Sequence, residues 1–327
     1  MSFDVADDST NEFRFLASDA AGVGLSGPLP EVRRVSVPLP DGRQLSALRY
    51  GDEHEAPEFV LLHGMGLNAH SFDPTALALG RPALAIDLAG HGRSDWRTDA
   101  NYRPDLLAQD IVVALDALAS GPVALVGHSL GALTSIVVAA LRPDAVRSLV
   151  IVDLTPGVTP ASDAAGITEF IAGQRAFNTI DEIVDRAVQF GIGSDRTALT
   201  RGVALNTRLR ADGKLEWTHH FAHLLPDPNN PAEVEAAANA AREAGSTPAD
   251  PTQPYAGLWA PLEEFAAPVS LIRGTTGMVS DAMLAEWRRR LPRAADFDLD
   301  TGHNVHEQDP VGLARLLTGI AQQVTDR

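Results

Sequence analysis

The passage from Val123 to Leu141 limits the possible folds of this chain more than any other. Four apolar residues, Val123 to Val126, lead into Gly127-His128-Ser129-Leu130-Gly131, and small and apolar residues then continue to Leu141. This order is typical of a buried strand, a tight turn and a buried helix. Glycines on both sides of Ser129 allow a turn sharp enough to hold the serine in a strained, exposed position.

Strand-like and helix-like segments alternate on both sides of this passage. The predicted strands are Val32–Val37, Gln44–Tyr50, Phe59–Leu62, Ala83–Ile86, Val123–Val126, Leu149–Val152, Val269–Arg273 and Ala295–Leu299. The predicted helices begin near Pro104, Leu130, Asp281 and Pro310. Strands that alternate with helices predict an α/β fold, with a mostly parallel twisted sheet and helices on both faces.

The alternation stops after Asp153 and resumes near residue 265. Between Leu154 and Glu264 the chain is polar, proline-rich and helical in pattern. An insertion of this size between two strands of one sheet predicts a cap over the active edge. We therefore expect an N-terminal extension over 1–31, a core over 32–153 and 265–327, and a helical cap over 154–264.

Composition excludes several classes of function. The 26 Lys and Arg against 43 Asp and Glu leave a net charge of −17, which disfavours nucleic acids and anionic membranes as partners. The absence of cysteine excludes disulfides, thiolate nucleophiles and cysteine-based zinc sites. Since the first residues do not resemble a signal peptide and no apolar run is long enough to cross a bilayer, we expect a cytoplasmic protein.

Ser129 requires a base, because a free serine hydroxyl is a poor nucleophile. His303 follows the last predicted strand, and Gly302 before it permits a tight turn towards the serine. His306 is the local alternative, and we predict His303. An oxyanion hole is expected from the backbone N–H of Leu130 and that of Met65, which lies in the glycine-rich turn after the third strand.

Together these segments resemble the α/β-hydrolase superfamily, in its capped branch of esterases, lactonases, carbon–carbon bond hydrolases and dehalogenase-like enzymes. The resemblance covers roughly Val32 to the C-terminus. It rests on four motifs, His63-Gly64-Met65-Gly66, Asp87 to Ser94, Gly127 to Gly131 and Gly302-His303. It implies the α/β-hydrolase fold with a cap inserted after strand six, and it is more specific for the fold than for the substrate.

The third member of the triad departs from the family pattern. Family members usually carry an aspartate in the loop after the strand that follows the cap, and Gly277 occupies that place. Asp281 lies four residues later, at a predicted helix start where capping is the simpler role. Some capped relatives take the acid from the end of strand six, where this chain has Asp153. We predict Asp153, which would orient the imidazole, and keep Asp281 as the alternative.

Three further groups of residues give weaker indications of function. Asp87 and His91 are interpreted as part of a scaffold loop rather than as metal ligands. A cluster of aromatic and imidazole side chains, Trp217, His219, His220, Phe221 and His223, is expected to line a pocket or to pack the cap, since no third ligand supports a zinc site. Arg175, Arg208 and Arg210 could pair with a substrate carboxylate or be solvated.

The sequence predicts a serine hydrolase that cleaves a carboxylic ester or lactone through an acyl-enzyme, without cofactor or metal. A carbon–carbon bond hydrolase acting on a ring-cleavage product would use the same triad. A non-catalytic homologue that binds a small molecule is the other alternative, favoured by Gly277. The expected partner is a small-molecule substrate, and neither that substrate nor the oligomeric state is predicted.

Overall fold

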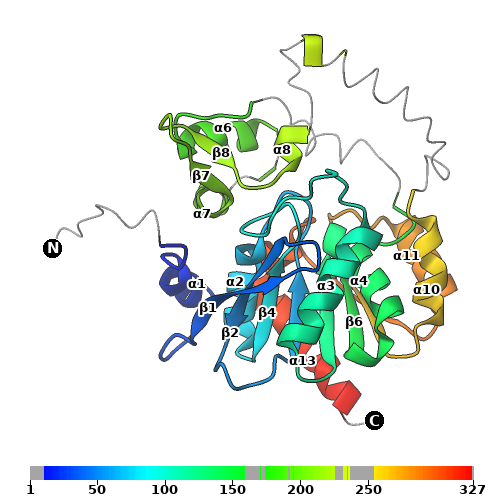
Figure 1. The fold of residues 1–327 in the computed structure, drawn as a ribbon. Helices are drawn as coiled ribbons and strands as arrows, with labels where there is room; N and C mark the ends of the chain where they lie inside the picture. The colour runs from blue at the N-terminus through cyan, green and yellow to red at the C-terminus, as the bar shows by residue number, and fades with distance from the viewer. Residues whose placement is uncertain are drawn as a thin grey trace.

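Eight strands form the central sheet of the computed structural model, in the order β1-β2-β4-β3-β5-β6-β9-β10 (Figure 1). The structure describes residues 11–158, 170, 174–190, 192–193, 195–224, 231–233, 235 and 254–325. The strands are β1 (Val32–Pro38), β2 (Gln44–Tyr50), β3 (Phe59–Leu62), β4 (Ala83–Asp87), β5 (Val123–His128), β6 (Val146–Val152), β9 (Val269–Gly274) and β10 (Ala295–Leu299). β2 pairs antiparallel with β1 and with β4, and the remaining pairs are parallel, so the predicted mostly parallel sheet is confirmed.

Helices cover both faces of this sheet. One face carries α3 (Pro104–Leu118), α4 (Leu130–Leu141), α10 (Trp259–Glu264) and α11 (Asp281–Arg290). The other carries η1 (Ala69–Phe72), α2 (Asp73–Leu79), α12 (Val305–Gln308) and α13 (Pro310–Thr325). The short turns η2 (Pro143–Ala145) and η3 (Ala256–Leu258) precede β6 and α10. None of the described helices is both long enough and apolar enough to cross a membrane.

The core lies in two layers because successive strand residues point to opposite faces. In β3, Val60 and Leu62 pack with α3 and α4, whereas Phe59 and Leu61 pack with α2 and α13. All four side chains are buried. A strand that is covered on both faces has no polar alternation, which explains why β3 was recognisable as a continuous apolar run.

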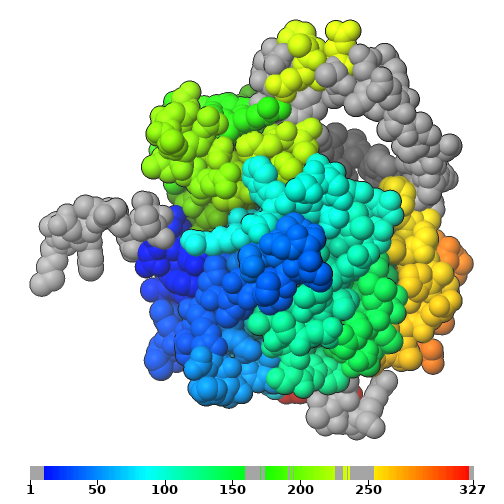
Figure 2. Space-filling view, in the orientation of Figure 1, coloured from blue at the N-terminus to red at the C-terminus, as the bar shows by residue number. Residues whose placement is uncertain are grey.

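A large segment enters between β6 and β9, which are neighbours in the sheet. It contains α6 (Ile180–Gln189), α7 (Arg196–Asn206), the hairpin β7 (Thr207–Leu209) and β8 (Leu215–Trp217), and α8 (Phe221–Leu224). A separate apolar cluster that includes Phe177, Ile183 and Trp217 holds these elements together. Figure 1 shows them gathered above the sheet, and Figure 2 shows them against the loop that follows β4. The hairpin was not predicted.

Part of the N-terminal segment packs on the core through a short helix. Helix α1 (Leu16–Gly22) places Leu16 and Ala20 against Leu77 of α2. Asp19 forms an ion pair of 2.7 Å with Arg201 of α7, so this segment also contacts the insertion. Residues 1–10 of the predicted extension lie outside the described part of the chain.

Candidate active site

Ser129 lies at the turn between β5 and α4 with φ 53° and ψ −116°, a region that costs a non-glycine residue energy. The turn is tight enough that its two glycines admit no side chain. A Cβ at position 127 would overlap the backbone carbonyl of Gly131, and one at position 131 would overlap that of Leu62. The strain at Ser129 is thus imposed by close backbone packing around it.

The Ser129 hydroxyl is not used by the helix that it precedes. Ser129 is the N-cap residue of α4, a position where serine commonly accepts a hydrogen bond from the first turn, yet its side chain makes no such bond. Its backbone N–H donates to the carbonyl of Val152 at 3.3 Å. The hydroxyl therefore stays available beside the carboxyl end of β6.

His303 and Asp153 form a direct contact at this edge of the sheet. The Nδ1–H of His303 donates to Oδ2 of Asp153 at 2.8 Å, and the Asp153 side chain is fully buried. Asp153 also accepts from the backbone N–H of Gly274 at 3.0 Å and that of Met278 at 2.7 Å. These bonds hold the carboxylate in place, and a proton on Nδ1 leaves Nε2 of His303 as a free base.

The same loop explains why position 277 is glycine. A Cβ at Gly277 would overlap the carboxylate of Asp153, so the space of the usual family aspartate is filled from β6 instead. Asp281 does not share this site: its side chain is 97% exposed and accepts from Arg273 Nη1 at 2.7 Å. Ser280, and not Asp281, caps α11 by accepting from the N–H of Met283.

His128 is a residue of the site that the sequence analysis missed. Its Nε2–H donates to the backbone carbonyl of His303 at 2.9 Å, and the two rings lie 4.5 Å apart. Burial holds the pKa of His128 well below its usual range, so this ring is a neutral donor. The bond links the residue before Ser129 to the loop of His303. Within the described residues, Ser129 Oγ and His303 form no hydrogen bond, a contact that in many enzymes tightens only when substrate binds.

His306, the alternative base, belongs to the core. It is completely buried, its ring lies 4.6 Å from that of Phe72, and neither ring nitrogen has a partner among the described residues. Burial lowers its pKa to about 3. A neutral, completely buried ring that makes no hydrogen bond among the described residues does not fit the role of the base.

The loop after β3 lies directly beside the serine. A Cβ at Gly64 would come within 3.1 Å of Ser129 Cβ. Met65 is 36% exposed, and the N–H groups of Met65 and Leu130 donate to no acceptor among the described residues. Free N–H groups at this position, next to the N-terminus of α4, are the donors that an oxyanion requires.

Both peptide groups of Gly66 are held by side chains that the sequence analysis did not assign to the site. The N–H of Gly66 donates to His91 Nε2 at 3.1 Å, and its carbonyl accepts from Asn206 Nδ2. Burial lowers the pKa of His91 to about 3, which keeps Nε2 an acceptor. Asn206 ends α7, so the insertion reaches the loop that carries Met65. A pairing across so much sequence has no local signal.

The predicted imidazole cluster joins the insertion to the core. His220 stacks on Trp96 at 4.2 Å and accepts through Nδ1 from the hydroxyl of Tyr102 at 2.6 Å. The backbone N–H of His220 donates to the backbone carbonyl of Gly90 at 2.8 Å. Among the described residues, no group of three or more potential ligands could hold a metal ion.

The other polar residues singled out in the sequence have structural partners. Asp87 accepts from the N–H of Ala69 at 2.7 Å and pairs with Arg34 at 2.7 Å. Each of the three arginines singled out in the insertion forms an ion pair: Arg175 with Glu233, Arg208 with Glu216 and Arg210 with Asp212.

Comparison with known proteins adds to this geometry. A family model described as "alpha/beta hydrolase fold" matches residues 57–310. Esterase Rv0045c of Mycobacterium tuberculosis is 35% identical over 318 residues, which cover 95% of this chain and 95% of the esterase. A crystal structure of that esterase superposes with a TM-score of 0.76 at 34% identity, covering 95% of this chain and 98% of its own. The crystal structure of E-2-(acetamidomethylene)succinate hydrolase gives a TM-score of 0.70 at 26% identity, over 89% and 100% of the two chains.

Proposed function

Because this chain belongs to the α/β-hydrolase family and resembles an esterase along nearly its whole length, we propose that it hydrolyses carboxylic esters, lactones included, with Ser129 as nucleophile. The observation that carries the proposal is the 2.8 Å hydrogen bond from His303 Nδ1 to the buried carboxylate of Asp153. It supplies an oriented base next to a strained serine.

In the acylation step, Ser129 Oγ attacks the ester carbonyl while His303 Nε2 takes the hydroxyl proton. Asp153 stabilises the imidazolium that forms, and it keeps its own charge. The negative charge on the carbonyl oxygen is stabilised by the N–H groups of Met65 and Leu130 and by the N-terminus of α4. When the tetrahedral intermediate collapses, the bond to the alcohol oxygen breaks and His303 returns the proton to that alcohol.

Deacylation repeats the sequence with water. His303 Nε2 takes a proton from a water molecule, whose oxygen attacks the acyl carbon. The bond to Ser129 Oγ then breaks, the serine recovers its proton from His303, and the carboxylic acid leaves. We propose that the insertion over residues 154–264 covers this site as a cap. A cytoplasmic location stays a prediction of the sequence.

The alternative of a non-catalytic homologue depended on the glycine at position 277. The hydrogen bond between Asp153 and His303 weakens that alternative, because the carboxylate occupies the space that a side chain at 277 would need.

A direct test combines hydrolysis with covalent labelling. We expect the protein to hydrolyse short p-nitrophenyl esters and a fluorophosphonate to label it. Ser129→Ala should lose labelling and about 10³-fold or more of kcat. Ser135→Ala is the matched control, since the Ser135 hydroxyl bonds to the Ala132 carbonyl within α4. Labelling that persists in Ser129→Ala, or folded protein without activity on any ester or lactone, would contradict the proposal.

A further inference from the structure

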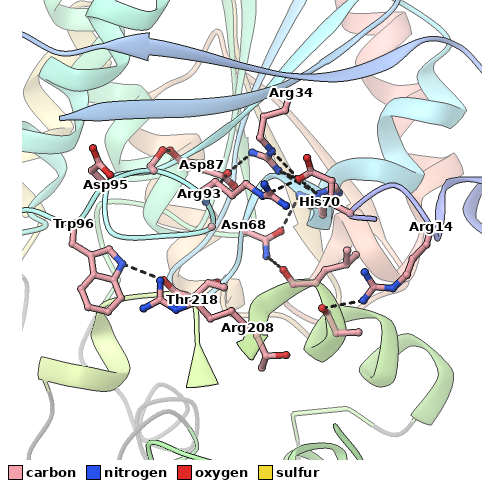
Figure 3. A pocket seen from close by; sticks show the side chains of 16 residues that line it. Arg14, Arg34, Asn68, His70, Asp87, Arg93, Asp95, Trp96, Arg208 and Thr218 are labelled. Carbon is pink, nitrogen blue, oxygen red and sulfur yellow. Dashed lines mark hydrogen bonds and ion pairs between the residues drawn. The ribbon is translucent and has the colours of Figure 1, made fainter. Parts of the chain in front are cut away.

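A polar cavity of about 540 Å³ reaches the loop after β3, at Asn68. Its walls come from the N-terminal segment, β1, the loops after β3 and β4, and the insertion, and they include neither Ser129, His303 nor Asp153. Figure 3 shows Arg34, His70 and Arg93 on one side of it and Trp96, Arg208 and Thr218 on the other. The core thus supplies one wall and the insertion contributes to the other.

The deeper charges of this cavity neutralise one another. Arg34 pairs with Glu12 at 2.6 Å and with Asp87 at 2.7 Å. His70 contacts Glu12 at 3.3 Å and Asp73 at 2.9 Å. Burial alone would lower the pKa of His70, but these carboxylates outweigh burial and raise it to about 9, so the ring is a cation. Glu12 and Asp87 are therefore already satisfied by cations of the protein.

Two arginines near the mouth retain unused donors. The side chain of Arg93 is 57% exposed, and its Nε lies 3.2 Å from Oε2 of Glu12. The side chain of Arg208 is 54% exposed, and its Nε–H donates to Glu216. Within the described part of the chain, the terminal nitrogens of both guanidinium groups make no hydrogen bond. Arg208 also lies over the ring of Trp96 at 5.4 Å, which limits its range of conformations.

We propose that this cavity is a binding site for a small organic anion with a carboxylate or phosphate group, bound between Arg93 of the core and Arg208 of the insertion. Guanidinium groups bind both kinds of oxyanion through paired N–H donors. The protein as a whole has a net charge of −17 and repels anions, so only a local cluster of arginines could retain one. The cavity volume lies within the range of small-molecule binding sites and leaves room for a small organic anion.

Such a ligand would bridge the core and the insertion. Hydrogen bonds link this cavity to the loop that carries Met65. Asn68 lines the cavity and donates to the carbonyl of Leu205 at 2.9 Å and to Oδ1 of Asn206 at 3.2 Å. Asn206 in turn holds the carbonyl of Gly66. Because the anion contacts both parts, binding should stabilise the docked insertion and raise the Tm.

The test measures binding by calorimetry and Tm by scanning, with sodium phosphate and sodium succinate as separate probes and sodium chloride at equal ionic strength as reference. We expect a Kd below about 1 mM for at least one probe and a rise in Tm of about 2 °C or more at saturation. Arg93→Gln and Arg208→Gln should each weaken binding about tenfold or more, since a charged hydrogen bond is lost. Circular dichroism checks that both variants are folded.

Arg103→Gln is the matched control, because Arg103 is an exposed arginine that pairs locally with Asp105 outside the cavity. Phosphate and succinate stabilise many proteins because they are excluded from the protein surface. The difference between wild type and the variants therefore distinguishes binding in the cavity from this general effect. Equal effects in wild type and in Arg93→Gln and Arg208→Gln, or no calorimetric binding of either probe, would overturn the proposal. The readouts do not use catalysis, so they are independent of the proposed esterase activity.

Discussion

At the scale of single residues, the candidate active site depends on a steric exchange between two positions. The side chain of Asp153 and a side chain at 277 cannot coexist, because the carboxylate fills the space of a Cβ there. Three hydrogen bonds hold that carboxylate, from His303, Gly274 and Met278. A chain without the usual aspartate after β9 can therefore keep the hydrogen bond between acid and histidine, because the acid comes from the end of the neighbouring strand β6.

Two amide substitutions separate the aspartates. Asp153→Asn should lower kcat about 10³-fold, because an amide can donate to Nδ1 and favour the wrong imidazole tautomer. Asp281→Asn is the control and should stay within about twofold, since Asp281 is exposed and paired only with Arg273 among the described residues. Steady-state ester hydrolysis measures both variants. A collapse in Asp281→Asn alone would show that the acid is misassigned.

Gly277→Ala tests the steric argument. The added methyl group must displace the Asp153 carboxylate, so we expect kcat to fall about tenfold or more and stability to fall by about 1–3 kcal/mol. Gly121→Ala provides the comparison, because a Cβ at that exposed position meets nothing within 4 Å. Hydrolysis kinetics and thermal unfolding should change in the first variant only, and wild-type kinetics in Gly277→Ala would refute the exchange.

At the scale of elements, the insertion and the core meet through a few specific contacts. Trp96 Nε1 donates to the carbonyl of Thr218 at 3.1 Å, and His220 stacks on the same indole. Asn206, at the end of α7, accepts from Thr218 Oγ1 at 2.9 Å and donates to Gly66. The geometry of the loop that carries Met65 is therefore coupled to the docking of α7 and β8.

Asn206→Ala should weaken this coupling. We expect kcat to fall about tenfold with KM nearly unchanged, because a misplaced Met65 N–H affects the transition state more than the bound ester. The affinity for a boronic acid, which mimics the tetrahedral intermediate, should fall in proportion to kcat/KM. Asn178→Ala, which removes an exposed asparagine of the insertion bonded to Glu182, is the control. A lower Tm with unchanged kcat and boronate affinity would indicate a structural role only.

At the scale of the whole molecule, several buried histidines are neutral. Burial lowers the pKa of His63 to about 4 and that of His91 and His306 to about 3, against an ordinary value of about 6.5. In the unfolded chain these rings take up protons below pH of about 6.5, whereas in the folded protein they do so only at lower pH. The stability that depends on these rings staying neutral is therefore fully present above a pH of about 6.5. It is lost as the pH falls towards the pKa values of the folded protein.

His306→Phe isolates one of these rings. His306 alone should remove about 2 kcal/mol of stability when the pH falls from about 7.5 to about 5. The variant should therefore lose less stability than wild type over this interval, whatever its packing cost, because that cost is present at both pH values. Chemical denaturation at the two pH values measures the difference. His54→Gln changes an exposed histidine and should match wild type, and an equal loss in His306→Phe would contradict the argument.

Much of the fold was predictable from the sequence because the information is local. Three strands, β2, β3 and β10, were predicted with the bounds that the structure has. In β3, which is covered on both faces, the signal is a continuous apolar run, whereas β10 at the edge of the sheet alternates apolar and acidic residues. The start of β6 was missed by three residues, since Arg147 and Ser148 interrupt the apolar run although Ser148 is buried in the sheet. The turn around Ser129 was recognisable because its glycines and flanking elements are contiguous in sequence.

Contacts between residues far apart in the chain were decided only by the tertiary structure. The pairing of His303 with Asp153 and the bond from Asn206 to Gly66 join segments 150 and 140 residues apart, and the cavity between Arg93 and Arg208 likewise needs two separate parts of the fold. The sequence by itself determined which residues carry reactive groups and which segments are buried, because burial and turns depend on neighbouring residues. Distances across the sheet depend instead on strand order and on how helices and insertion dock, and many sequences with the same local pattern could arrange these differently.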